Sequence, residues 1–165
     1  MDNETAAIWV DADSCPRRIR EIVARAASRC HVPARYVANR DIRLPASEYV
    51  SLEVVSGDPE AVDARILSAA RRGDFVVTRD IPLAARLVER GLIVLNDRGV
   101  VYTAENVGER LSLRNFSKEL REAGVYRAGG GALDRRSIHR FANALDRELR
   151  RCRKQPADGP PSRRA

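Results

Sequence analysis

The segment Ile8-Trp9-Val10-Asp11-Ala12-Asp13-Ser14-Cys15-Pro16 opens with three apolar residues and turns at once to two carboxylates. The apolar run predicts a strand. Ser14 and Pro16 are typical of a helix start, with Ser14 as the cap of the first amides. In an open parallel sheet, ligands bind beyond the carboxyl ends of the strands, so we expect Asp11 and Asp13 at the active-site edge. The alternative is that one aspartate caps the helix and the other is simply exposed.

Strands and helices alternate along most of the chain. After the first strand, further strands are predicted over residues 34–38, 49–55, 74–78, 92–95 and 100–102, and helices over 16–29, 60–72, 81–90, 104–111, 113–123 and 134–151. This alternation indicates an α/β domain with a mainly parallel sheet. Right-handed crossovers bring the ends of its successive parallel strands to one edge.

Length and composition suggest a single domain over residues 6–151 with an aliphatic core, because hydrophobic residues make up 44% and aromatics only 5% of 165 residues. No apolar run approaches the roughly 20 residues that span a bilayer, and the N-terminus is acidic, so we expect a cytoplasmic protein without a membrane partner. Three cysteines at wide spacing argue against a disulfide framework, and Cys15 beside two carboxylates is expected to be an inert thiol.

The basic charge is concentrated at the C-terminus. Residues 149–165 contribute +5 of the net charge of +7, leaving +2 for the other 148 residues. We expect residues 152–165 to form a disordered basic tail, which either contacts the phosphates of a nucleic acid or is a solvated end.

Carboxylates follow the predicted strands in four segments. Asp11 and Asp13 follow the first strand, and Asp63 opens the helix after the third. Asp80 follows the strand over 74–78, and Asp97 follows the strand over 92–95. Packed carboxylates repel one another unless a cation neutralises them, and an all-oxygen site suits Mg²⁺ or Mn²⁺. Such ions support hydrolysis of phosphodiesters. The alternative is a scattered set of helix caps and turns.

Other polar residues at the same edge are candidates for contacts with substrate. Asn39 follows the second strand, Thr78 ends its strand beside Asp80 and is suited to hold a bound water, and Arg79 and Arg98 can meet phosphates or be solvated surface charges. Only two histidines are present, and neither stands at ligand spacing from a cysteine, which argues against a structural zinc site.

The chain resembles the YaiI/YqxD family of bacterial proteins. The resemblance rests on residues 8–16, on Val37-Ala38-Asn39, on Thr78-Arg79-Asp80-Ile81-Pro82-Leu83-Ala84 and on Leu95-Asn96-Asp97-Arg98-Gly99, and motifs near Tyr102, Glu109 and Phe141 extend it to residues 6–150. That family is placed near the PIN-like nucleases. The resemblance therefore implies a PIN-like three-layer α/β/α sandwich with a mainly parallel central sheet.

The resemblance also implies roles for the acids. Asp11, Asp63 and Asp80 would be the catalytic core of a metal site, with Asp13 and Asp97 as supporting ligands. One departure concerns the family pattern Gly-x-Asp-x-Ala-Asp, where this chain has Asp58 in place of the glycine and Glu60 in place of the first acid but keeps Asp63. The function implied is a Mg²⁺- or Mn²⁺-dependent nuclease that hydrolyses RNA or single-stranded nucleic acid.

Two other functions stay open at this point. A catalytically inactive PIN-like domain would serve as an RNA-binding or protein-interaction module. An aspartyl-phosphate phosphatase would use Asp11 as nucleophile and Asp13 as general acid, but it needs a lysine near the phosphate, and the chain has only Lys118 and Lys154.

Overall fold

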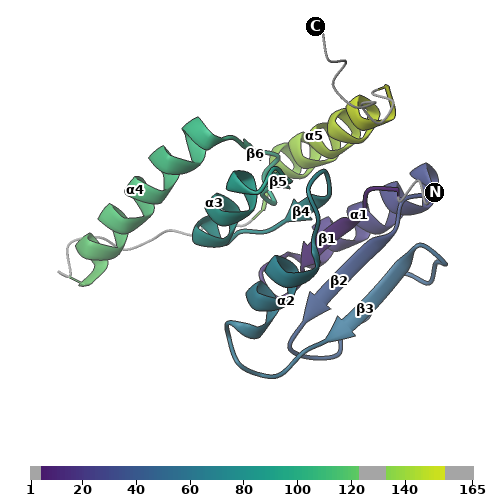
Figure 1. Cartoon of the computed structure of the whole chain (residues 1–165), viewed down its shortest axis with the longest axis horizontal. Coiled ribbons are helices and arrows are strands. Elements are labelled where there is room, and N and C mark those ends of the chain that lie inside the picture. Colours follow the sequence, from purple (N-terminus) through teal and green to yellow (C-terminus); the bar gives the residue numbers. More distant parts are fainter. Residues whose placement is uncertain (1–4, 123–132, 155–165) are drawn as a thin grey trace, which may run out of the picture.

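The computed structural model describes residues 5–122 and 133–154 (Figure 1). The elements in chain order are β1 (Ile8–Asp11), α1 (Arg17–Cys30), β2 (Ala34–Ala38), β3 (Val50–Val54), α2 (Ala61–Ala69), β4 (Phe75–Val77), α3 (Ile81–Glu89), β5 (Ile93–Leu95), β6 (Val101–Tyr102), α4 (Ala104–Glu122) and α5 (Arg135–Lys154). The sequence Gly129-Gly130-Gly131 predicts a break between the last two helices, and these residues lie outside the described ranges.

The strands form one six-stranded sheet in the order β3-β2-β1-β4-β5-β6. All neighbours are parallel except β5 and β6, which are antiparallel. The chain runs outward from β1 to β3 and then returns through α2 to β4 on the other side of β1. This reversal creates a topological switch point between β1 and β4, and open α/β sheets bind ligands there.

The alternation of side chains along β1 assigns its residues to two cores. Ile8 and Val10 pack under α1 and α5, whereas Trp9 packs under α2 and α3. Because successive side chains of a strand point to opposite faces, Asp11 belongs to the same face as Trp9. The strand therefore delivers Asp11 to the side of the sheet that α2 and α3 cover.

Helices cover both faces of the sheet, which confirms the predicted three-layer α/β/α arrangement. Helices α1 and α5 pack together on one face, and α2 and α3 lie on the other, with α4 packed against α3 (Figure 1). None of the helices in the described ranges is long and apolar enough to cross a membrane.

Several predicted boundaries differ from the structure. Pro16, not Ser14, is the N-cap of α1, and α1 has no side-chain cap, so the predicted capping role of Ser14 is wrong. The two helices predicted over 104–111 and 113–123 are one continuous helix, α4. Helix α2 ends at Ala69, with the backbone of Ala70 already extended. Helix α5 runs to Lys154, so it includes three residues that we assigned to the tail.

The turn between β5 and β6 fits tightly against α5. Gly99 has a φ of +83°, and a Cβ at this position would lie 2.6 Å from the backbone carbonyl of Arg140. The turn and the helix approach each other this closely because residue 99 has no side chain.

Candidate functional site

Asp11 lies at the switch point and is almost fully buried, with 4% of its surface exposed. Its Oδ2 accepts hydrogen bonds from the hydroxyls of Thr78 (2.8 Å) and Ser14 (2.9 Å). Burial raises the pKa of Asp11, the two hydroxyl bonds lower it in part, and the negative charge of Asp80 raises it further. The chain thus holds a carboxylate in place at a position where a negative charge is costly.

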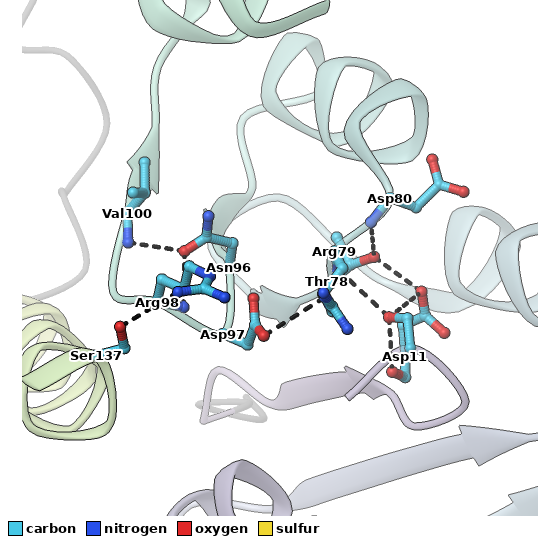
Figure 2. Close-up of polar contacts among 10 residues, drawn as sticks. Asp11, Thr78, Arg79, Asp80, Asn96, Asp97, Arg98, Val100 and Ser137 are labelled. Atoms are coloured by element: carbon cyan, nitrogen blue, oxygen red, sulfur yellow. Dashed lines mark hydrogen bonds and ion pairs between the residues drawn. The ribbon is translucent and has the colours of Figure 1, made fainter. Parts of the chain in front are cut away.

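Thr78 links Asp11 to the next acid along the sheet edge. Its Oγ1 donates to Asp11 and accepts from the backbone N–H of Asp80 at 3.0 Å (Figure 2). Phe75 and Val77 pack on the α1 side of the sheet and Val76 on the α2 side, so Thr78 follows on the α2 side, as Asp11 does. Thr78 therefore positions Asp11, and its expected role in holding a bound water stays a prediction.

Asp80 has a structural role besides its place in the site. It is the N-cap of α3, and its Oδ1 accepts from the backbone N–H of Leu83 at 2.9 Å. The interpretation of this acid as a helix cap is therefore correct. A carboxylate uses only part of its acceptor capacity in one such bond, so the cap leaves Asp80 able to bind a further group.

Asp63 approaches the same place from α2. It lies in the first turn of that helix, within hydrogen-bonding reach of the Asp80 carboxyl. Burial, followed by the charges of Asp80 and Asp11, raises the pKa of Asp63 to about 6. Three acids from three separate segments therefore crowd together strongly enough to disfavour ionisation of at least one of them.

Asp13 is engaged by the loop after β2. Its Oδ2 accepts from the backbone N–H of Asn39 at 2.8 Å. Both residues line the same cleft as the three central acids. Asp13 thus stands at the rim of the site and ties the two loops that follow β1 and β2.

Asp97 does not line that cleft. It is 4% exposed, and its Oδ2 lies 3.4 Å from Nε of Arg79, which does line the cleft (Figure 2). Asp97 follows β5, one strand further from the switch point than β4. Its contact with the site therefore passes through Arg79. Arg98, a further phosphate candidate, instead donates to Ser137 at the start of α5.

Asp11, Asp63 and Asp80, which are buried or half-buried, form the floor of an open cleft of about 860 Å³. The charged side chains around them are exposed; they are Asp13, Arg40, Arg79 and Arg114. Arg114 comes from α4 and was missed in the sequence, because it follows no strand. The signal that could have found it is the four-residue spacing of Arg110, Arg114 and Lys118.

The fit of this donor set to a divalent ion is partial. Within residues 5–122 and 133–154, no three His, Cys, Asp or Glu side chains lie close enough together to hold a metal ion. Mg²⁺, however, usually keeps several waters and is held by one or two carboxylates together with substrate phosphates. The Asp63–Asp80 pair meets that requirement, with Asp11 behind it, whereas the predicted set of five ligands is not assembled.

Cys15 lies beneath the site and is buried. Burial, and next the charge of Asp97, raises the pKa of its thiol well above the ordinary value. A thiol held in this protonated form is a poor nucleophile. The structure thus agrees with the prediction of an inert cysteine.

Fold and site together define an α/β protein with an acidic cleft at the switch point of a mainly parallel sheet. A family model described as "Uncharacterized BCR, YaiI/YqxD family" matches residues 9–151, and the chain belongs to this family. The match confirms the resemblance noted in the sequence.

Curated relatives cover nearly the same range. The chain is 48% identical over 142 residues to a UPF0178 protein of Syntrophobacter fumaroxidans, covering 86% of this chain and 93% of the relative. It is 49% identical over 144 residues to a UPF0178 protein of Myxococcus xanthus, covering 87% and 94%. A UPF0178 protein of Treponema pallidum is 50% identical over 141 residues, covering 86% and 80%. No solved structure matches the chain.

Proposed function

We propose that this protein is a PIN-like nuclease that uses Mg²⁺ or Mn²⁺ to hydrolyse RNA or another single-stranded nucleic acid. The observation that carries the proposal is the convergence of Asp11, Asp63 and Asp80, from β1, α2 and the start of α3, on the floor of a cleft rimmed by arginines. A cation would relieve the repulsion between these acids, and the guanidinium groups would bind the phosphates of a polyanion.

Each residue of the cleft would have its own role in the reaction. Asp63 and Asp80 would hold the ion, which when bound supplies an activated water and offsets the charge of the phosphoryl group. Asp11, which also lines the cleft, is held by the hydroxyls of Thr78 and Ser14 at its Oδ2. Arg79 pairs with Asp97 and lines the cleft, where its guanidinium would meet a phosphate oxygen. The PIN-like assignment is supported by the acidic carboxyl edge of the parallel sheet.

One observation favours a second candidate, an inactive RNA-binding or interaction module. The absence of a three-acid group at metal-binding spacing among the described residues would be expected if the site had lost its metal. The phosphatase alternative gains no support, because no lysine is found among the described residues that line the cleft.

Labelled single-stranded RNA and DNA, incubated with Mn²⁺, Mg²⁺ or EDTA, test the proposal. We expect cleavage with either ion and none in EDTA. Asp63→Asn and Asp80→Asn should abolish cleavage, and Asp41→Asn, which removes one charge from an exposed loop outside the cleft, should not. Cleavage that persists in EDTA would refute the metal mechanism, and metal-independent binding without cleavage would favour the inactive module.

A further inference from the structure

Helix α4 separates its charges by sign. At about 100° per residue, its four basic side chains fall within a sector of about 80° around the helix; they are Arg110, Arg114, Lys118 and Arg121. The four acids lie outside that sector; they are Glu105, Glu109, Glu119 and Glu122. A helix that was merely solvated would mix the two signs along one face.

The basic sector is the one that faces the body of the protein and the cleft. Val107, at its centre, is the buried residue of α4. The guanidinium of Arg110 lies 5.9 Å from the ring centroid of Tyr102, and Arg114 lines the acidic cleft. Lys118 and Arg121 continue the same line and are exposed. Figure 1 shows α4 extending beyond α3, so this part of the helix stands clear of its neighbour.

The basic side chains are not committed to acids of the fold. Among the described residues, neither Arg114 nor Lys118 nor Arg121 forms an ion pair. Phe116, which is 57% exposed, lies on the opposite side of the helix, whereas Leu113, which is 58% exposed, lies about 100° from the centre of the basic sector. A line of unpaired cations that starts in the cleft is complementary to a polyanion that continues out of it.

We propose that the basic face of α4, formed by Arg110, Arg114, Lys118 and Arg121, is a track for the phosphate backbone of a single-stranded nucleic acid that leaves the acidic cleft. This inference rests on the proposed function, and it assigns substrate positioning to residues outside the cleft. The face is roughly 16 Å long at about 1.5 Å per residue, enough for several phosphates of one strand.

The burial of Asp11 favours an unpaired strand. Asp11 is almost fully buried, and the open cleft beside it is also lined by Asp63 of α2 and Arg114 of α4. A flexible single strand can adapt its path to bring a phosphate to these residues, whereas a duplex presents its phosphates on a rigid cylinder. Phosphate contacts of this kind give affinity without base specificity.

The test measures binding in EDTA, where no metal-dependent cleavage occurs. The probe is a fluorescent single-stranded RNA, and the variant is Lys118→Ala/Arg121→Ala, which leaves the cleft itself intact. The matched control is Arg18→Ala/Arg25→Ala, which removes the same charge from exposed positions of α1 on the other face of the sheet.

We expect the α4 variant to bind about tenfold more weakly at low salt than wild type or control. Each phosphate contact with a single strand adds about 0.7 to the slope of log Kd against log salt, so the loss of two contacts should lower the slope by about 1.4. The affinity gap would then narrow about sevenfold between about 50 and about 200 mM salt.

Equal binding of RNA by the α4 variant and the α1 control would overturn the track. Polyglutamate serves as a second probe. The track would also be overturned if the α4 variant lost affinity for polyglutamate but kept its affinity for RNA. The outcome is separable from that of the proposed function. If the wild-type protein cleaves RNA but the α4 variant binds RNA as tightly as wild type, only the track is refuted. If the wild-type protein does not cleave RNA but the α4 variant binds it more weakly, only the nuclease proposal is refuted.

Discussion

Replacement of Asp63 by Asn should stabilise the metal-free protein. Asp63 has an ordinary pKa of 3.8, and its pKa in the folded protein is about 6. A group with a raised folded pKa binds its proton more tightly in the native state than in the unfolded state. The free energy of unfolding therefore falls as the pH rises from about 4 to about 6, and the full cost is present above that range.

The magnitude follows from the size of this difference. At about 1.4 kcal/mol per pKa unit, the change from 3.8 to about 6 corresponds to at most about 3 kcal/mol. The Asp63 side chain is only partly buried, so water screens much of the repulsion, and we expect a gain of about 1 kcal/mol at neutral pH and above. For a chain of this length, that gain corresponds to a rise in Tm of about 2–4 °C.

The assay is a thermal melt of wild type, Asp63→Asn and the control Asp41→Asn in EDTA, at about pH 8 and about pH 4. At about pH 8, Asp63→Asn should have a higher Tm than wild type. At about pH 4, the two Tm values should differ little, because Asp63 of the folded wild type is largely protonated at that pH. A lower or unchanged Tm at pH 8, or an equal gain in Asp41→Asn, would show that neither burial nor the charges of Asp80 and Asp11 disfavour the ionised Asp63.

Three further changes test other parts of the structure. Because an Asn can keep the cap of α3, Asp80→Ala should be about 1 kcal/mol less stable than Asp80→Asn in urea unfolding; equal stability would mean that the cap contributes nothing. Asp74→Ala removes the acceptor for the indole N–H of buried Trp9 and for two backbone amides, so chemical denaturation should show a loss of about 2–3 kcal/mol, and a change under about 0.5 kcal/mol would contradict this role. Gly99→Ala should cost about 2 kcal/mol or more, because its Cβ would meet the Arg140 backbone at a positive φ, and a wild-type Tm would show that the turn can move away.

The sequence was sufficient for the fold class because its strands and helices alternate regularly. It also identified the three acids of the cleft floor, since each stands at a strand end or at the following helix start. It could not give the order of the strands. That order makes β1 and β4 neighbours, so Thr78 can connect Asp11 to Asp80 by hydrogen bonds. The same order places Asp97 one strand further from the switch point, after β5.

The remaining differences have local causes. Ser14 resembles a helix cap, but its hydroxyl donates to the Asp11 carboxylate and accepts from the backbone N–H of Arg79 instead. Arg114 lies in a helix far from any strand end, so only the three-dimensional course of α4 brings it to the cleft. Residues 104–123 were predicted as two helices instead of one because the distal half of α4 buries little, and periodic burial is the signal on which such predictions depend.

The central claim is the proposal that Asp63 and Asp80 hold one divalent ion beside Asp11. Crystals soaked in Mn²⁺ and measured for anomalous scattering test it most directly. The account predicts a strong peak between the Asp63 and Asp80 carboxylates, on the side that faces Asp11, and its loss in Asp63→Asn crystals. No peak at a Mn²⁺ concentration that supports cleavage, or a peak that remains in Asp63→Asn, would contradict the account.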